Sequence, residues 1–554
     1  MAKFNTKNAQ PRPKAVTPIR ASTVPTGRTY QDGPGFRRDS KSELFILGVS
    51  YLAGENTYYE WGNQRDKRFV NLVHRVALDD PAWMVNFIHW LRHEGNIRTA
   101  PIVAAAEMTA ARLKAKVDDR KNPNETGYSR RAIRAAIARA DEPAELIAYW
   151  FRHFGRSLPK PVKRGIADAV KHIYTEKNVL KWDSREHSIR MGDVINLTHP
   201  APETLIRSIL FKHILNRRYN NKADIPLVLE MLRNNLALRN LPVHLRRQIL
   251  KKDNAAQILQ DAGITWEFLA GWLEGPMDKE AWEAVIPSMG VMALLRNLRN
   301  FDNAGVSDEV AKMVMNKITS PEDIKRSKVL PMRFLSAYNS VKNSSVRWLW
   351  ALEQGLNESL NNIPELPGRT LILVDRSNSM FAPMSSRTNL TYADAAAIFG
   401  AAIAMRAEKA DLVQFGTTAY PVKFKRGHSL LKILKQFNNL GGTYTREAIA
   451  AFYKHHDRVL VITDEQAAYH NVLFMPHDFD GDVFTGIVPD HVPCYTWNLG
   501  GYRHGHSSSG EGNRHTFGGL TDACFYLVDL VEKGMAGSWP WDQQTAAYTG
   551  VVDR

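Results

Sequence analysis

The chain has 554 residues, too many for a single hydrophobic core, which predicts two or more domains. It is 44% hydrophobic and 23% charged, as ordinary globular proteins are. Its only cysteines, Cys494 and Cys524, exclude a disulfide framework and a zinc site built on thiolates. The N-terminus lacks an apolar secretory segment, and the longest apolar run, Ala395 to Met405, is too short to cross a bilayer. We therefore expect a cytoplasmic protein with no membrane partner.

The formal net charge of +16 is unevenly distributed along the chain. Residues 1–360 carry 56 of the 73 basic residues and 38 of the 57 acidic ones, a net of +18, whereas residues 361–554 carry a net of −2. A basic excess confined to one region is typical of a protein that binds a polyanion, and nucleic acid is the first candidate. A surface that is charged only for solubility is the alternative.

Residues 1–40 are rich in Pro, Thr, Lys and Arg and poor in apolar residues, which predicts a disordered basic arm. Over residues 41–360 the apolar residues recur with the period of a helix. In DDPAWMVNFIHWLRHEG, Asp80 is the expected N-cap and Pro81 the first helical residue. The stretches EPAELIAYWFRHFG, APETLIRSILFKHIL and GVMALLRNLRNF follow the same pattern. Many short amphipathic helices in series predict an α-helical solenoid.

Strands and helices alternate over residues 361–554. The stretches TLILVD, ADLVQFG, YPVKFK, RVLVITD and PCYTWNLG predict strands. Helices are predicted for TYADAAAIFGAAIAMRAEKA, HSLLKILKQFNNLGG, TREAIAAFYKHH and LTDACFYLVDLVE. This alternation predicts an α/β domain with a doubly wound, mostly parallel sheet that is covered on both faces.

Two of the predicted strands end in a carboxylate, Asp375 after LILV and Asp464 after VLVIT. Ser377 and Ser379 alternate with Asp375 in one short loop. Ligands of open α/β sheets bind beyond the carboxyl ends of the strands, and oxygen side chains of this kind suit a hard cation. Hydroxyl ligands would leave such an ion electrophilic enough to take an acidic group from a partner. The alternative is a strand end whose serines only cap a turn.

The motifs DRSNS at 375–379, GGT at 441–443 and TDE at 463–465 resemble the metal-ion-dependent adhesion site of von Willebrand factor A domains. The resemblance implies Mg²⁺, or another divalent cation, held directly or through water. The residues that would hold it are Asp375, Ser377, Ser379, Thr443 and Asp464. Thr445 competes with Thr443 for this role, because the loop reads GGTYT.

A basic helical region followed directly by such a domain resembles the Ro ribonucleoproteins, which share the TROVE module, and their bacterial relatives. HSIRMGDVINLTHP, MALLRNLRNF and PMRFLSAYNSV carry the helical part of the resemblance. It implies a HEAT-like solenoid that closes into a ring over residues 41–360. It further implies a monomer that binds small structured Y-like RNAs on its outer surface and single-stranded 3′ ends of misfolded RNAs in its hole. Such a protein acts in RNA quality control, and a Y-like RNA can tether a 3′-to-5′ exoribonuclease to it.

Basic residues of the helical region are the candidates for contacting RNA, through phosphates and with little sequence preference. They are Lys163, Arg164, Lys171, Arg185, His187, Arg190, Arg207, Lys212, Arg217, Arg218, Arg296 and Arg299. For any single one of them, a solvated helix face is the alternative. In YRHGHSSSGEGNRH, which looks like an addition to the family core, His504, His506 and His515 predict a flexible polar loop rather than a metal site.

No catalytic residues are expected, because the chain has no G-x-x-x-x-G-K-[ST], H-E-x-x-H or G-x-S-x-G motif. The leading hypothesis is a non-catalytic RNA-binding protein. A protein-interaction scaffold that acts through the metal site, with incidental basic charge, is one alternative. A metal-dependent nuclease is another.

Overall fold

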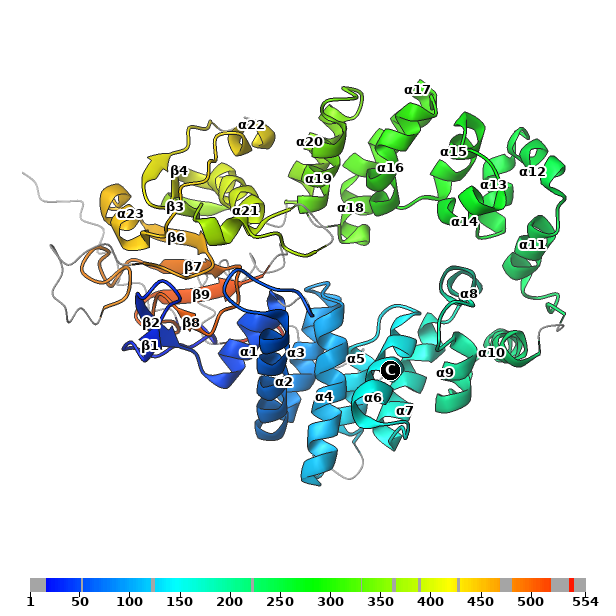
Figure 1. Ribbon diagram of the computed structural model, residues 1–554, viewed down its shortest axis with the longest axis horizontal. Coiled ribbons are helices and arrows are strands. Elements are labelled where there is room, and N and C mark those ends of the chain that lie inside the picture. Colours follow the sequence, from blue (N-terminus) through cyan, green and yellow to red (C-terminus); the bar gives the residue numbers. More distant parts are fainter. Residues whose placement is uncertain are drawn as a thin grey trace, which may run out of the picture. The chain divides into compact units, whose positions relative to one another are not determined.

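The structure, a computed structural model, is formed by two compact units (Figure 1). It describes residues 16–50, 53–120, 125–220, 224–329, 331–360, 365–386, 390–425, 429–468, 481–519 and 538–542. One unit, here the helical unit, is Ala77–Ser359. The other, here the sheet unit, combines both ends of the chain, Met1–Val76 and Leu360–Arg554. The predicted fold class, α plus α/β, is confirmed.

The described residues of the helical unit form helices and turns without a strand. The unit is entered through α2 (Gly62–Asp79), which begins in the sheet unit. Its further helices are α3 (Pro81–His93), α4 (Thr99–Ala115), α5 (Tyr128–Ala135), α6 (Glu142–Phe154), α7 (Lys160–Ile173), α8 (Glu176–Trp182), α9 (Met191–Thr198), α10 (Leu205–Tyr219), α11 (Glu230–Arg239), α12 (Val243–Leu250), α13 (Ala255–Asp261), α14 (Trp266–Trp272), α15 (Lys279–Val285), α16 (Val291–Asn303), α17 (Asp308–Thr319), α18 (Pro321–Ser327), α19 (Pro331–Val341) and α20 (Leu349–Glu358).

The helices form where the apolar period and the capping residues predict them. Asp80 caps α3 by accepting a hydrogen bond from the backbone nitrogen of Trp83 at 3.0 Å, and Pro81 is the first helical residue. In α16 the apolar residues Val291, Leu294, Leu295, Leu298 and Phe301 are buried, as the sequence pattern predicts. Successive helices pack on their neighbours, for example α5 on α7 and α9 on α10, as in a solenoid.

Two loops of the helical unit that lie far apart in the sequence are in contact. The side-chain amide of Asn96, after α3, donates a hydrogen bond to the carbonyl oxygen of Lys328 at 3.1 Å. The Lys328 ammonium in turn donates to the carbonyl oxygen of His93. These bonds join the loop after α3 to the residue that follows α18, within one unit.

The sheet unit is built on a six-stranded sheet of order β5-β4-β3-β6-β7-β9. All pairs are parallel except β4 with β5, and the order reverses direction beside β3, as in a doubly wound fold. The strands are β3 (Leu366–Asp375), β4 (Ala407–Phe415), β5 (Ala419–Pro421), β6 (Arg458–Thr463), β7 (Cys494–Asn498) and β9 (Arg514–Gly518).

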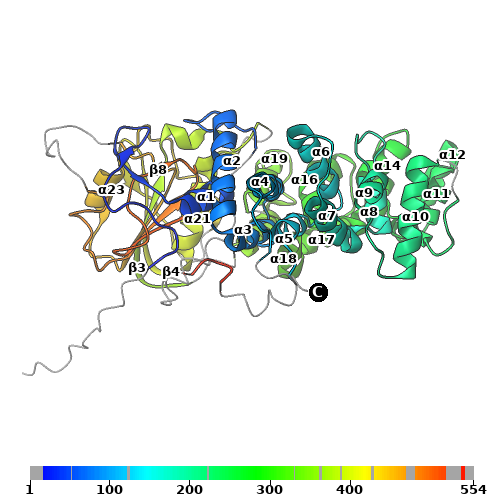
Figure 2. The same ribbon diagram turned by 90° about the horizontal axis from the view of Figure 1, so that it is seen from below.

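Helices cover both faces of this sheet. Gly400 of α21 (Tyr392–Arg406) approaches so closely that a Cβ atom there would lie 2.3 Å from Val374. Leu371 and Leu373, which alternate with Val374 along β3, pack instead in a core with Ile449 of α23 (Thr445–Phe452). Helix α22 (Leu430–Leu434) packs on α21, and α1 (Ser40–Val49) lies against β9. Figures 1 and 2 show α1 and α21 in two views.

The N-terminal segment is part of the sheet unit, which differs from the expected division of the chain. Instead of a disordered arm, residues 16–40 contain β1 (Gly27–Arg28) and β2 (Pro34–Arg37), and β2 pairs with β8 (His504–Gly505). Arg38, only 3% exposed, forms an ion pair with buried Glu465. The arm prediction failed there because the partners of the segment lie near the other end of the sequence. Residues 1–15 lie outside the described part.

Other local predictions also differ from the structure. His506 and His515 are each 1% exposed, and His515 belongs to β9, so the segment predicted as a flexible polar loop is largely buried, although Glu511 and Gly512 are exposed. Helix α21 ends at Arg406 and β4 begins at once, because Ala407 and the residues after it pair with β3. The predicted helix LTDACFYLVDLVE lies outside the described residues. Among the described helices, none is both long and apolar enough to span a bilayer.

Arg65 of α2 provides a test of the packing of the N-terminal segment. Its guanidinium, 1% exposed, donates to the carbonyl oxygens of Gly500 at 2.7 Å and Ser50 at 3.0 Å. Arg65→Ala would leave these buried acceptors unpaired, at a cost of about 2–4 kcal/mol. We expect a clearly lower melting temperature, measured by circular dichroism. Lys67→Ala, at an exposed position of the same helix, is the matched control, and equal melting temperatures for the two variants would contradict this packing.

Candidate functional site

Adjacent parallel strands bring the two strand-end carboxylates together. Val374 of β3 pairs with Ile462 of β6, so Asp375 lies opposite Thr463, one residue before Asp464. The Asp375 carboxylate accepts hydrogen bonds from the Thr463 hydroxyl at 2.5 Å and from the backbone nitrogen of Ser377 at 2.8 Å. The sheet order therefore holds both carboxylates at the point where the topology switches direction.

The serine loop and the glycine loop lie side by side. The hydroxyls of Ser377 and Ser379 are 3.2 Å apart. Ser377 forms a parallel bridge with Gly441, and the backbone nitrogen of Asn378 donates to the Gly441 carbonyl at 2.7 Å. Gly441 has a φ of +83°, which favours glycine at this turn. The pairing brings the GGT loop beside the DRSNS loop, as the motif resemblance implies.

Arg376 connects the DRSNS loop to the segment that precedes the GGT loop and to the start of α21. It is 5% exposed and donates to the carbonyl oxygens of Asn438 at 2.9 Å and Ala393 at 2.7 Å. Its guanidinium also lies over the rings of Phe381 and Phe437, 4.7 and 5.5 Å from the centroids. Burial lowers the pKa of Arg376 to about 10, so it stays charged at neutral pH. Its fixed charge organises the loop without occupying a ligand position.

The carboxylates of this site are buried at high electrostatic cost. The exposed fractions of the five predicted ligands are 4% or less: Asp375, Ser377, Ser379, Thr443 and Asp464. Burial raises the pKa of Asp375. Burial, and then the charge of Asp375, raise the pKa of Asp464 to about 7, although Ser379 donates a hydrogen bond to it. Two carboxylates held this way favour a proton or a cation between them.

The donor set fits a hard divalent cation. It offers two carboxylates and several hydroxyls, the oxygen ligands that Mg²⁺ prefers. The Thr445 hydroxyl is buried without a hydrogen-bond partner among the described residues, so both threonines of the GGTYT loop stay candidates. In the described part of the chain no three His, Cys, Asp or Glu side chains gather as a metal site, so an ion here would depend on hydroxyl ligands. Such an ion would neutralise the repulsion between the carboxylates.

Two tyrosines that the sequence analysis missed lie at this site. Burial, and after it the charge of Asp464, raise the pKa of Tyr59 to about 12, and the ring of Tyr59 lies 5.5 Å from that of Tyr502, centroid to centroid. Tyr502 is 3% exposed, and its hydroxyl accepts a hydrogen bond from the Tyr59 backbone nitrogen at 3.4 Å. No local motif could have predicted this contact, because Tyr59 and Tyr502 lie far apart in the sequence.

The predicted RNA-contacting residues lie on four segments of the helical unit. Helix α7 carries Lys163, Arg164 and Lys171, the loop before α9 carries Arg185, His187 and Arg190, α10 carries Arg207, Lys212, Arg217 and Arg218, and α16 carries Arg296 and Arg299. The exposed members are Arg164, Arg185, His187, Lys212, Arg296 and Arg299. No contact among the described residues joins the two arginines of α16 to the other ten.

One acidic residue organises part of this set. The Asp183 carboxylate forms ion pairs with the guanidinium groups of Arg190, at 2.6 Å, and Arg217, at 3.0 Å. Burial lowers the pKa of Arg217, and the charge of Asp183 acts in the opposite direction. The charges of Arg190 and Arg185 also lower this pKa, so Arg185, Arg190 and Arg217 lie close together. Arg239 belongs to the same neighbourhood and was missed, since it lies on a separate helix, α11, whose sequence gives no sign of this proximity.

Arg190 does not fit the role predicted for it. It is 7% exposed, and both nitrogens of its guanidinium fork are bound to the Asp183 carboxylate. Such a buried, bidentate pair positions the start of α9 and leaves Arg190 unable to approach a phosphate. Arg218 is similarly bound to Asp193, at 2.8 Å, but remains half-buried.

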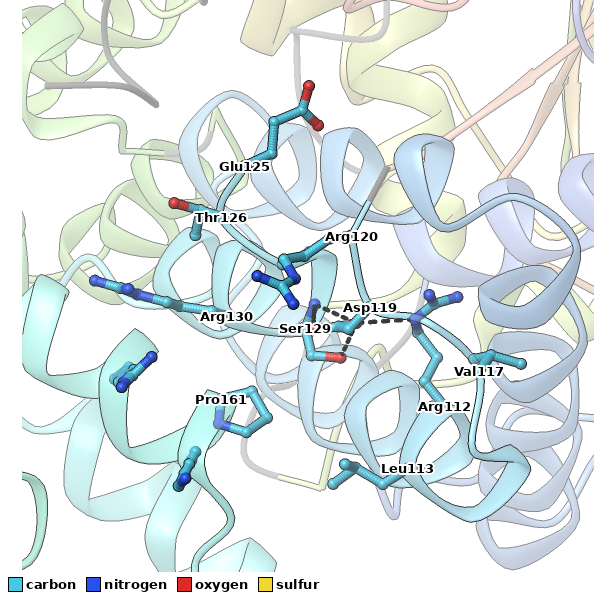
Figure 3. Close-up of a pocket in the computed structure, with 13 residues that line it drawn as sticks. Arg112, Leu113, Val117, Asp119, Arg120, Glu125, Thr126, Ser129, Arg130 and Pro161 are labelled. Carbon is cyan, nitrogen blue, oxygen red and sulfur yellow. Dashed lines mark hydrogen bonds and ion pairs between the residues drawn. The ribbon is translucent and has the colours of Figure 1, made fainter. Parts of the chain in front are cut away.

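A cavity of about 550 Å³ in the helical unit collects further basic residues (Figure 3). The end of α4 and the beginnings of α5 and α7 line it. Asp119 orders its rim by accepting hydrogen bonds from Arg112 and from the backbone and hydroxyl of Ser129. No ion pair joins Lys160 or Arg164 to a carboxylate in the part of the chain that the structure describes. The cavity therefore presents cationic side chains beside two helix N-termini, which favours anions.

Comparison with known proteins agrees with this architecture. Residues 265–351 match the family model of the TROVE domain. The crystal structure of the Ro (RSR) protein of Deinococcus radiodurans superposes with a TM-score of 0.60 at 17% identity, covering 90% of this chain and all of that one. No curated protein sequence matches. Residues 265–351 thus resemble a TROVE domain in sequence, and the chain shares the fold of a Ro protein.

The buried carboxylates predict a pH dependence of the metal-free protein. In EDTA the folded-state pKa of Asp464, about 7, lies above its value of roughly 3.9 in an unfolded chain. The folded protein therefore binds the proton more tightly, and this stabilisation is lost as the pH rises through about 7. We expect the melting temperature in EDTA to fall more between pH 5 and pH 8 for wild type than for Asp464→Asn. Identical slopes would contradict the buried carboxylate pair.

Arg190 and Arg185 give a matched pair of substitutions. Removing one partner of a buried ion pair costs about 3 kcal/mol or more, so Arg190→Ala should lower the melting temperature of the helical unit by several degrees. Arg185→Ala, at an exposed position of the same loop, should leave it nearly unchanged. Thermal unfolding followed by calorimetry measures both, and comparable losses in the two variants would show that Arg190 is not the structural residue of the pair.

Proposed function

We propose that the chain is a non-catalytic RNA-binding protein that acts in RNA quality control, with the helical unit as its RNA-binding part. The observation that supports this proposal is the net positive charge of the helical unit, in a chain that shares its fold with a Ro protein. Residues 77–359 contain 43 basic and 32 acidic residues, a net of +11, against +5 for the rest of the chain. An excess of this size attracts a polyanion by releasing the counterions of its phosphates.

Exposed cations in separate places would let the helical unit contact more than one part of an RNA. Arg164 and Lys160 line the cavity beside α5 and α7, whereas Arg296 and Arg299 lie on α16. Phosphate contacts of this kind position an RNA without reading its sequence. They suit small structured, Y-like RNAs and single-stranded 3′ ends of misfolded RNAs, which are the ligands that we propose.

We further propose that Mg²⁺ or a related divalent ion is held by the two aspartates and the hydroxyls beside them. The ion supplies positive charge between Asp375 and Asp464, and Ser377, Ser379 and one threonine of the GGTYT loop complete its oxygen ligands. A tethered 3′-to-5′ exoribonuclease, a monomeric state and a cytoplasmic location belong to the same proposal. These three features rest on the family resemblance alone.

Burial of the metal site argues against the two rival functions. A scaffold that captures a partner through the ion would need ligands that a partner's carboxylate can reach, and a nuclease would need room for a phosphate and a water. Yet the five predicted ligands are at most 4% exposed in this chain. The metal site is therefore better suited to an internal role than to either alternative.

The experiment is a gel-shift titration with three probes: a hairpin RNA with a single-stranded 3′ tail, the same hairpin with a blunt end, and a DNA duplex. Each is titrated at two salt concentrations with and without EDTA. We expect the tailed RNA to bind most tightly, with an affinity that falls with salt and does not change with EDTA. Equal affinity for all three probes would refute the proposed RNA specificity. Shortening of the RNA only with Mg²⁺ would favour the nuclease.

The two exposed arginines of α16 provide a variant for the same assay. Arg296→Ala with Arg299→Ala should weaken binding of the tailed RNA about tenfold. If both contact single-stranded phosphates, the slope of log affinity against log salt should fall by about 1.4. Lys67→Ala in the sheet unit removes an exposed cation elsewhere and serves as the control. A double variant that binds with wild-type affinity and slope would exclude α16 from the interface.

A further inference from the structure

The cavity formed by the end of α4 and the beginnings of α5 and α7 has the charge of an anion site (Figure 3). Of the described residues that line it, five are basic, and two, Asp119 and Glu125, are acidic, a net of +3. Figure 3 shows the Glu125 carboxylate directed away from Arg120 and Arg130. The volume of about 550 Å³ lies within the range of about 300–1,000 Å³ that is typical of small-molecule pockets, so a bare phosphate ion would fill only a small part of it.

One carboxylate and one arginine of the lining are occupied within the fold. Asp119 accepts hydrogen bonds from Arg112 at 3.0 Å and from the hydroxyl of Ser129 at 2.7 Å. Arg112, 4% exposed, also donates to the carbonyl oxygens of Ala77 at 2.9 Å and Asp118 at 2.5 Å. The charges of Asp119 and Arg112 therefore offset each other, and the other cations of the lining are in excess.

Arg130 of α5 and Arg164 of α7 line the cavity where these two helices are in close contact. A Cβ atom on Gly165, the residue after Arg164, would lie 2.7 Å from the carbonyl oxygen of Arg130. Arg130 binds Asp168 of α7 through Nε at 2.6 Å and Nη2 at 2.9 Å. All three guanidinium nitrogens are donors, so Nη1 of Arg130 is left for a ligand.

Lys160 and Arg164 contribute two cations from the beginning of α7. Both are exposed, and in the described part of the chain neither side chain donates a hydrogen bond to another residue. They are four residues apart, which places them on one face of the helix. A phosphate on this side of α7 would therefore receive donors from both α5 and α7.

Apolar side chains form another part of the same lining. Leu113 and Val117, at the end of α4 and just after it, are 45% and 42% exposed, and Pro161 lies at the start of α7 (Figure 3). Large apolar side chains that remain in water gain free energy when a ligand covers them. A small inorganic anion would not cover them, whereas a nucleotide carries a phosphate together with a flat base.

We propose that this cavity binds one nucleotide that carries a terminal phosphate, with the phosphate at Arg130, Lys160 and Arg164 and the base against Leu113 and Val117. A terminal phosphate fits the excess of cations better than a phosphate within a chain, because a monoester carries about 1.5 to 2 negative charges at neutral pH. The nucleotide is a free mononucleotide or the phosphorylated end of a bound RNA, and the second case rests on the proposed function.

Calorimetric titration of the full chain tests the site with three small probes: adenosine 5′-monophosphate, adenosine and inorganic phosphate. We expect the monophosphate to bind at least about tenfold more tightly than either of the others, because only it offers both the charge and the apolar surface. Equal affinities for the monophosphate and inorganic phosphate would overturn the assignment to a nucleotide. Absence of monophosphate binding would overturn the site for free nucleotides.

Substitutions at exposed positions separate the two parts of the site. Lys160→Ala with Arg164→Ala should weaken binding of the monophosphate at least about tenfold. Leu113→Ala should weaken binding of the monophosphate and leave that of inorganic phosphate unchanged. Lys114→Ala, at an exposed position of α4 outside the lining, is the matched control and should bind as wild type. Equal monophosphate affinity in wild type and the double variant would overturn the site.

A short single-stranded RNA distinguishes the two sources of the nucleotide. It is titrated with a phosphate at its 5′ end, at its 3′ end or at neither, and binding is followed by fluorescence anisotropy. A preference for one phosphorylated end that the double variant at Lys160 and Arg164 loses assigns that RNA end as the ligand. Monophosphate binding without such a preference assigns a free nucleotide.

The outcomes also distinguish this site from the proposed function. RNA that binds equally well with and without a terminal phosphate, together with no binding of the monophosphate, would overturn the site and leave RNA binding intact. A preference for a phosphorylated end that persists in the double variant would overturn the location of the site. If no RNA binds, the proposed function fails, and the monophosphate titration alone decides the site.

Discussion

The sheet unit depends on two carboxylates that the strand order forces together in a buried place. Asp375 and Asp464 end neighbouring parallel strands, and neither is more than 3% exposed. Each raises the free energy of ionising the other, and burial adds to that cost. Two neighbours of Asp375 reduce this cost: the Thr463 hydroxyl donates a hydrogen bond to it, and the positive charge of Arg376 favours its ionised form. A divalent ion would supply what these groups leave uncompensated.

The same constraint explains why both ends of the chain form one unit. A pair of carboxylates open to water could stay ionised by hydration, but a buried pair needs its surroundings fixed. Arg38 and Arg65 help to fix these surroundings, because they bind residues of the loops after β6 and β7. The arginines near the N-terminus are thus used inside the protein.

The sequence predicted what depends on local order and missed what depends on distant pairing. Asp80 and Pro81 start α3 by interactions within its first turn, and β3 and β6 are continuous apolar runs, so both were predictable. The metal motif was found because its three parts have fixed chemistry. The contact of Tyr59 with Tyr502, by contrast, joins distant parts of the sequence. Arg190, which is paired with Asp183, looks from composition like free positive charge. Neither pairing leaves a local signal in the sequence.

Pairing also decides which part of the positive charge can act on RNA. In the sheet unit Arg38, Arg65 and Arg376 are at most 5% exposed and bound to carboxylates or carbonyl oxygens. Their charge therefore stabilises the fold and does not reach a ligand. In the helical unit Arg296 and Arg299 are exposed on α16. A phosphate gains from an arginine only where the guanidinium still has donors to offer. Affinity for RNA should therefore reside in the helical unit.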